Sequence, residues 1–244
     1  MSQIVGRRFS KNMLIMLVAI MVGVIVITFF VADLMRRQAS EEKIESLNEE
    51  ITTKEKEIVD VKKRNINFTN HFLKSLGVLD KARGDRADGN YNFDVAFLWY
   101  NTALSATNSS KLETYKNVTI SNCEKAMVNY SVSSKNFELA SQFFNKTTNY
   151  TVYDGYIELL DLYMNLTGSG VKLTNARYNT SLYLKYLAEN LTIENNTVGY
   201  LTNVSDLQEA FNESMMMYSE MLGMYSEQLE MIEEYDIEGF STKR

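Results

Sequence analysis

Asparagine followed two positions later by serine or threonine is the pattern in this chain with the clearest chemical use, because it is the acceptor for N-linked glycans. Twelve of the 22 asparagines after residue 32 stand in this pattern, while Ser and Thr fill 35 of the same 212 positions. Chance alone would give roughly 3 to 4 such triplets, so the enrichment predicts N-glycosylation. A helical protein rich in Asn, Ser and Thr with coincidental spacing is the alternative. The candidate acceptors are Asn67, Asn108, Asn117, Asn129, Asn145, Asn149, Asn165, Asn179, Asn190, Asn195, Asn203 and Asn212.

Residue types that build most catalytic and metal sites are scarce. Cys123 is the only cysteine and His71 the only histidine of the chain. An intramolecular disulfide is therefore impossible, and Cys-based zinc sites, Ser-His-Asp triads and Cys-His pairs lack their partners. The sequence also contains no phosphate loop, nucleophile elbow or dinucleotide fingerprint. We therefore expect no enzyme activity, no cofactor and no metal site.

Two weaker patterns resemble metal sites. Met217, Met221 and Met224 share one helical face, and thioethers can bind Cu(I), but methionine at this spacing usually serves as packing. Acids and amides alternate over residues 88–94 like the start of a calcium loop. That loop needs Gly at its sixth position and Glu at its twelfth, where this chain has Phe93 and Trp99. We expect neither metal to bind.

Two further patterns carry charge without an obvious site. Asp154, Glu158 and Asp161 fall on one helical face, and paired carboxylates can do acid–base chemistry. Nothing nearby predicts a pocket, so a solvated acidic surface is the favoured interpretation. Residues 83–85 read Arg-Gly-Asp, the integrin tripeptide, and we expect this to be a chance occurrence.

The stretch "MLIMLVAIMVGVIVITFFVA", residues 13–32, carries no charge. As a helix of 20 residues it would extend about 30 Å, which matches the hydrocarbon core of a bilayer. A cleavable signal peptide has a shorter apolar stretch and a small-residue cleavage site. We therefore predict an uncleaved transmembrane signal anchor at 13–32, preceded by a basic tail at 1–12. The alternative is a buried core helix, which would need a domain large enough to surround it.

The orientation of this anchor depends on the glycan acceptors. Three basic residues precede the span and three follow it closely, so the positive-inside rule gives nearly a tie. Glycan acceptors are used only outside the cytoplasm, which predicts a cytoplasmic N-terminus and an extracytoplasmic C-terminal part. Residues 33–244 contain 31 acids and 22 Lys and Arg, a net of −9, which disfavours nucleic acid as a partner.

Cysteine usage also bears on the class of protein. Ectodomains of animal proteins usually carry paired cysteines. A chain with many glycan acceptors, one Cys and no Pro resembles in style an archaeal cell-surface protein. The absence of proline also favours long uninterrupted helices.

Apolar residues after the membrane segment recur at spacings of three and four. The seam contains Ile44, Leu47, Ile51, Lys54, Ile58, Val61, Asn65, Phe68 and Phe72. This is a heptad pattern with two polar interruptions, and it predicts a helical stalk over residues 33–72. Two alternatives remain open: the stalk self-associates as a coiled coil, or its seam packs on the chain's own domain.

A 44-residue repeat follows. "NFDVAFLWYN" at 92–101 corresponds to "NFELASQFFN" at 136–145, and "DKA" at 80–82 to "EKA" at 124–126. We expect each unit, 80–103 and 124–147, to hold a helix, a turn and a second helix capped by Asn92 or Asn136. The expected packing residues are Phe93, Ala96, Tyr100, Phe137, Ala140 and Phe144.

This pattern resembles the tetratricopeptide repeat. Gly84, Ala96, Tyr100 and Ala103 match the small and aromatic signature positions of that family. The second unit has Val128 in place of the glycine and Thr147 in place of the last alanine, and the period exceeds the 34 residues of the family. Residues 179–187 resemble a weaker third copy. The resemblance, which covers about residues 80–190, implies a protein-docking scaffold, whereas an ordinary helical bundle is the alternative.

Glycines indicate where the helices should end. "GDRADGN" at 84–90 and "TGSGV" at 167–171 fit turns between helices. A last helix is expected from an N-cap at Ser205 to a stop at Gly239. Its seam holds Phe211, Met215, Tyr218, Leu222, Tyr225, Leu229 and Ile232, and an adjacent stripe holds Met217, Met221, Met224, Met231 and Tyr235. Because this apolar face is wide, we expect it to be buried.

These expectations combine into an all-α, single-pass surface protein, in which residues 73–244 form an extracytoplasmic domain, either a bundle or a short solenoid of helical hairpins. Its expected partners are membrane lipid and a protein, or a second copy through the stalk or the helical domain. The leading function is a non-catalytic structural or docking module. The alternatives are an extracytoplasmic sensor or accessory subunit of a transport or signalling complex, and a cytoplasm-facing docking protein of opposite topology.

Overall fold

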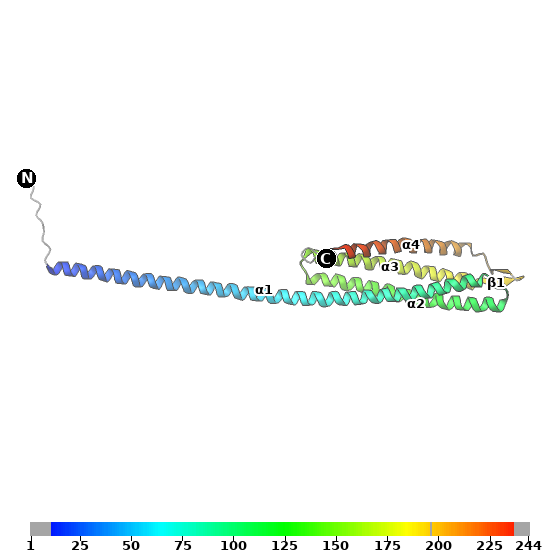
Figure 1. The fold of residues 1–244 in the computed structure, drawn as a ribbon, viewed down its shortest axis with the longest axis horizontal. Coiled ribbons are helices and arrows are strands. Elements are labelled where there is room, and N and C mark those ends of the chain that lie inside the picture. The colour runs from blue at the N-terminus through cyan, green and yellow to red at the C-terminus, as the bar shows by residue number, and fades with distance from the viewer. Residues whose placement is uncertain (1–10, 196, 237–244) are drawn as a thin grey trace, which may run out of the picture. The chain divides into compact units, whose positions relative to one another are not determined.

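The computed structural model describes residues 11–195 and 197–236, with side chains from residue 16 onward except residue 17 (Figure 1). The described residues are overwhelmingly helical, which confirms the predicted helical class and adds one short hairpin. The elements in chain order are α1 (Lys11–Ala103), α2 (Ser109–Thr147), the 3-10 helix η1 (Thr148–Tyr150), α3 (Asp154–Glu189), β1 (Leu191–Glu194), β2 (Thr197–Tyr200) and α4 (Ser205–Glu234).

The chain divides into two units, residues 1–62 and 63–244. The described part of the first unit is a single helix, the N-terminal part of α1. Its described residues from 16 to 62 are all exposed except Gly23. This helix contains a window of mean hydropathy 2.6 with none of it buried, so its length and composition suffice to cross a membrane.

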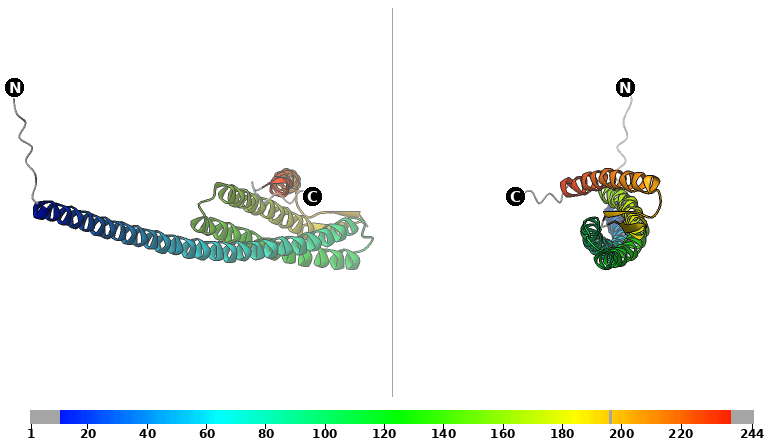
Figure 2. Two further views of the ribbon diagram at one scale, coloured as in Figure 1. Left: turned by 60° about the vertical axis from the view of Figure 1, so that its left-hand side comes forward. Right: turned by 90° about the vertical axis from the view of Figure 1, so that its right-hand side faces the viewer.

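The second unit packs residues 63–103 of α1 with α2, α3 and α4. Its helices run back and forth, with the α1–α2 connection and the β-hairpin at one end and the α2–α3 connection at the other (Figure 1). The helix α4 lies obliquely across the other helices of this unit (Figure 2). Packing begins upstream of the predicted boundary at residue 73, because Phe68 stacks on Tyr156 at 4.8 Å and Phe72 meets Tyr163 edge-on at 5.6 Å.

The 44-residue repeat has a different structural basis from the one expected. Each copy is continuously helical, one in α1 and one in α2, so the turn predicted within each copy was wrong. The two helices pair antiparallel, and the buried side chains of this unit form two core clusters. In each cluster, the first half of one copy meets the second half of the other. Ala126 shares a cluster with Phe93, and Ala82 shares the other with Phe137. The two copies therefore pack against each other, and both contribute residues to both clusters.

The glycine-containing turns are also corrected, since residues 84–90 lie inside α1 and 167–171 inside α3. Two of these glycines let helices approach closely. A Cβ on Gly89 would lie 2.6 Å from a ring carbon of Tyr130, and one on Gly170 would lie 2.6 Å from ring carbons of Phe137. Close contact therefore explains glycine at these two positions, where the local sequence alone indicated breaks.

The two asparagines expected to cap helices lie within them. Asn92 donates to the carbonyl oxygen of Asp88 at 2.8 Å, and Asn136 in α2 donates to the Asp85 carboxylate of α1 at 2.7 Å. The side chain that does cap α2 is Asn108, whose Oδ1 accepts from the Lys111 amide at 3.0 Å. The expected caps were wrong because the helices are longer than the repeat unit.

The last helix begins close to its predicted start. Ser205 is the first residue of α4, and Val204 occupies the N-cap position in its place. The Ser205 amide donates to the side-chain oxygen of Asn203 at 3.0 Å, which satisfies one free helix-end donor. The helix ends at Glu234, and the predicted stop at Gly239 lies outside the described residues.

The hairpin between α3 and α4 had not been predicted. Leu191 pairs with Tyr200 and Glu194 with Thr197, which leaves a two-residue turn. Asn195 enters this turn at φ 53°, a conformation that asparagine tolerates better than most residues. The sequence signal was present as β-branched residues on both sides of an Asn-Asn pair.

Candidate functional site

The twelve candidate glycan acceptors all lie in the described part of the chain, and none of them is buried. Nine are exposed, and Asn67, Asn129 and Asn190 are half-buried. Other asparagines do structural work: Asn90 accepts from the Tyr130 hydroxyl at 2.8 Å, and Asn136 holds Asp85. Asparagines in the acceptor pattern therefore largely face solvent, where a glycan can be accommodated.

The acceptor triplets differ in whether the partner hydroxyl, as well as the asparagine, is accessible in the folded chain. In a helix, residues two apart point to nearly opposite sides, so an exposed Asn places its partner hydroxyl toward the core. Thr119, Thr147, Thr167 and Ser181, the partners of four exposed asparagines, are each 0% exposed. By contrast, Asn195 and Asn203 lie in the hairpin turn and the loop before α4. Loop triplets remain accessible in the folded chain. In these four helical triplets the partner hydroxyl is accessible only before the chain folds.

The six residues expected to pack the repeat belong to the two core clusters. Phe93, Ala96 and Tyr100 lie in the first cluster, and the second contains Phe137, Ala140 and Phe144. The Tyr100 hydroxyl is 2.6 Å from that of Tyr200, which joins the end of α1 to the hairpin. Burial, and then this hydrogen bond, raise the pKa of Tyr100. These six residues therefore position the helices and present no reactive group to solvent.

The single cysteine and the single histidine lie in packing environments. Cys123 is 0% exposed inside the first cluster, and its burial raises the pKa of the thiol to about 12. A thiol with such a pKa is protonated near neutral pH and is a poor nucleophile. The His71 ring stacks on that of Tyr150 at 4.7 Å. Among the described residues, no three His, Cys, Asp or Glu side chains group as a metal site.

The acidic face at the start of α3 lies beside the end of α4. Glu158, Asp161 and Leu162 line a shallow groove with Met231 and Tyr235. The Tyr235 hydroxyl donates to a Glu158 carboxylate oxygen at 2.8 Å. All three acids of this face, Asp154 included, are exposed. The arrangement is a solvated surface that helps to hold the end of α4.

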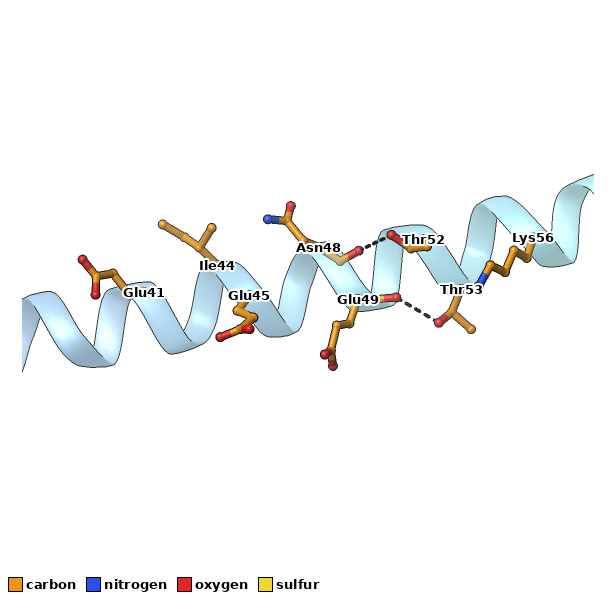
Figure 3. A pocket seen from close by; sticks show the side chains of 8 residues that line it. All are labelled: Glu41, Ile44, Glu45, Asn48, Glu49, Thr52, Thr53 and Lys56. Carbon is orange, nitrogen blue, oxygen red and sulfur yellow. Dashed lines mark hydrogen bonds between the residues drawn. The ribbon is translucent and has the colours of Figure 1, made fainter.

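The other hollows of the surface have little enclosure. One groove runs between α2 and α3, where Glu138, Gln142, Met164, Val171 and Lys172 are among the lining residues. Another hollow is lined only by residues of α1, from Glu41 to Lys56 (Figure 3). Because all of its side chains project from one helix, it has no opposing wall and does not enclose a ligand.

A buried arginine that sequence analysis missed joins three helices. Arg177 of α3 is 8% exposed, and its guanidinium lies 3.8 Å from the ring centre of Phe93 in α1 and 4.3 Å from that of Tyr218 in α4. It donates to the Asp94 carboxylate at 3.4 Å, but its Nε has no hydrogen-bond partner among the described residues. The available signal was its position on the stripe that also contains Leu173, Thr180 and Leu184, all of which are buried.

Arginines also hold α4 at a second point. Arg83 Nε donates to the Tyr225 hydroxyl at 3.0 Å, and the Arg86 guanidinium lies 4.6 Å from the centre of the same ring. The Arg-Gly-Asp tripeptide is thereby engaged within the bundle, because Arg83 contacts Tyr225 and Asp85 contacts Asn136. The wide face of α4 is only partly covered, contrary to expectation: Met217 and Met231 are each 54% exposed.

No protein-family model, no curated protein and no solved structure matches this chain. Functional inference therefore depends on the placement of its own residues. The described surface contains potential attachment sites for sugars and an uncovered apolar helix face. Its described His and Cys side chains are engaged in packing.

Proposed function

We propose that this protein is a non-catalytic, single-pass membrane protein whose glycosylated helical bundle stands outside the cytoplasm as a structural or docking module. The apolar part of α1 supports the anchor, and the residues that follow it carry all twelve acceptor triplets. The observation that carries the proposal is the accessibility of the acceptors. Nine of the twelve acceptor asparagines are exposed, and none is buried.

The position of each acceptor in the fold predicts how fully it is occupied by a glycan. Asn195 and Asn203 lie outside helices, so their triplets remain available after folding. Asn117, Asn145, Asn165 and Asn179 have partner hydroxyls that folding buries. We expect the first group to carry sugar most fully, and the second to carry it only if transfer precedes folding.

The test uses protein purified from the membranes of its own cells. Intact mass before and after chemical deglycosylation measures total sugar, and peptide mapping gives the occupancy of each acceptor. We expect a mass above 28.0 kDa and occupancy at Asn195 or Asn203. Protease added to intact cells should remove the bundle. An unmodified mass combined with a protected bundle would refute both glycosylation and topology, and would favour a cytoplasm-facing docking protein.

A second candidate function, an extracytoplasmic sensor or accessory subunit, draws support from the groove between α2 and α3. Its lining combines apolar Met164 and Val171 with charged Glu138 and Lys172, a mixture suited to a peptide or small ligand. Reproducible co-purification of one transport or signalling component from native membranes would favour this candidate over the first.

A further inference from the structure

The buried residues of α1 follow a single heptad frame. All eight buried positions of this helix in the described chain lie on one seam with alternating spacings of four, three and seven residues: Ser75, Leu79, Ala82, Gly89, Phe93, Ala96, Tyr100 and Ala103. Phe68 and Phe72 lie on the same frame and pack against α3. The three-and-four spacing is therefore the pattern by which α1 recognises other helices.

The same frame continues upstream of residue 63, where Lys54 is its one polar position between Ile44 and Val61. Its apolar members there are Ile44, Leu47, Ile51, Ile58 and Val61, and each is between 48% and 55% exposed. Within the first unit α1 is the only described element, so nothing in that unit covers them. A helix with this stripe exposed to water gains free energy by burying it against another helix.

We propose that residues 44–61 form a parallel, two-stranded coiled coil with a second copy of this chain. In the heptad notation, the a positions hold Ile44, Ile51 and Ile58, and the d positions hold Leu47 and Val61, with Lys54 between them. Ile at a with Leu at d favours two parallel strands over three or four. The three Ile at a and Leu47 at d therefore favour two strands over three or four.

The charges beside the seam include one pair that favours this pairing and one that opposes it. In a parallel dimer, the g position of one helix faces the following e position of the other, which brings Glu57 of one copy to Lys62 of its partner. The equivalent pair formed by Glu50 and Glu55 is repulsive. Lys54 lies between them on the seam and supplies the compensating charge, and in the single chain it already contacts Glu57 at 3.0 Å.

The membrane anchor favours the parallel arrangement independently. When two copies are anchored through residues 13–32, both stalks begin at the same membrane surface. Their seams are therefore held in register. The seam spans about three heptads, which is marginal for an isolated coiled coil, and confinement to a membrane raises the effective concentration of the second strand. The parallel direction rests on the anchor of the proposed function, but not on glycosylation or on the side of the membrane.

Single cysteines test the proposal in the full-length chain reconstituted in lipid vesicles. Cys123 can stay because it is buried, and the unsubstituted chain is the background control. Leu47→Cys and Val61→Cys place thiols on the seam. Glu49→Cys and Lys63→Cys, two residues away from each, place them on the outer face as matched controls. Mild oxidation should give covalent dimers at least several-fold faster for the seam variants.

A disrupting pair completes the test. Ile51→Glu on the seam should suppress cross-linking at Leu47→Cys by about tenfold, whereas Thr53→Glu off the seam should leave it unchanged, with equal helical circular dichroism in both. Equal cross-linking at seam and outer positions would overturn the proposal. Preferential joining of residue 47 to residue 61 would overturn the parallel direction. Cross-linked species of three or more chains in the vesicles would overturn the two-stranded state, whatever the outcome for the glycans.

Discussion

Two glycines in α3, separated by one residue, should respond oppositely to the same substitution. Gly170 is buried, and a Cβ there would lie 2.6 Å from two ring carbons of Phe137 in α2. Gly168 is exposed, and a Cβ there would have no neighbour within 4 Å. Because both residues are inside the helix, substitution by Ala improves the helix propensity by the same amount at both sites. The difference between the variants therefore isolates the contact with Phe137.

The magnitudes follow from two opposing effects. Ala is better than Gly in a helix interior by about 0.8–1.0 kcal/mol, so Gly168→Ala should raise the free energy of unfolding by nearly this amount. At Gly170 the same gain is offset by overpacking, which typically costs about 1–3 kcal/mol. The Phe137 ring is 0% exposed and meets the edge of Tyr225 at 6.1 Å, so it has little room to move. We expect Gly170→Ala to lower stability by about 1–2 kcal/mol.

The assay is denaturant unfolding of the full-length protein in a mild detergent. Trp99 is the only tryptophan, and its ring lies 5.3 Å from that of Tyr115 in α2, so its fluorescence reports separation of α1 from α2. Circular dichroism monitors the helices in parallel. Equal stabilisation by both substitutions would refute the close approach of α2 and α3. Destabilisation by both would restore the turn at 167–171 that the sequence had suggested.

Three further predictions concern buried groups of the bundle. Arg177→Met should change the free energy of unfolding by less than about 1 kcal/mol and Arg177→Ala should lower it by about 2–4 kcal/mol, because packing on two aromatic rings outweighs a long ion pair with an exposed acid. Cys123 should resist a thiol reagent at pH 8 and react with one equivalent after unfolding, and prompt reaction of the folded protein would contradict its burial. Burial raises the pKa values of Cys123, Tyr100 and Tyr130, so the unfolded chain loses these protons first as the pH rises. Stability measured by the same unfolding assay should therefore fall above pH 9, by about 1.4 kcal/mol per pH unit for each group once its unfolded form has ionised, and a flat profile to pH 11 would refute this.

The helical class, the apolar segment and the seam of α1 could be predicted because each depends on periodicity along one helix. The interpretation of Gly89, Gly170, Asn92 and Asn136 failed because these residue types have two common uses. Gly can mark a turn or a close helix contact, and Asn can cap a helix or bond across to another. Only the neighbouring helix decides between the uses, and local sequence does not identify that neighbour.

The repeat illustrates the same limit at the level of a whole unit. A repeat of small and aromatic residues fits a hairpin within each copy or pairing between copies. The second arrangement holds, since Ser133 Oγ of the second copy donates to the Ala82 carbonyl oxygen of the first at 2.7 Å. Arg177 was missed for a related reason: its burial depends on Phe93 and Tyr218, which belong to two other helices.

The acceptor triplets and helix packing are linked by the geometry of the helix. A helix that buries small hydroxyl residues against its neighbours and exposes Asn two positions earlier generates acceptor triplets without further selection. This accounts for triplets such as Asn117 with Thr119, where the hydroxyl donates to the Tyr115 carbonyl oxygen at 2.9 Å. It does not account for Asn195 and Asn203, because these asparagines lie outside α-helices. Occupancy at these two sites is therefore the most informative measurement of glycosylation.

The heptad frame of α1 also limits where a second copy can pair. One helix face cannot be covered twice, and from Phe68 onward the seam is taken by the chain's own helices. A partner strand must therefore leave the seam between Val61 and Phe68. The only seam position in that interval is Asn65, and its side chain is exposed. A polar residue that is exposed to water at this position costs little stability. In a parallel pair, the side chains of two copies of Asn65 would hydrogen-bond to each other and fix the register. Asn65→Leu should accordingly raise dimer stability while loosening register, which cross-linking between cysteines at residues 47 and 54 would detect.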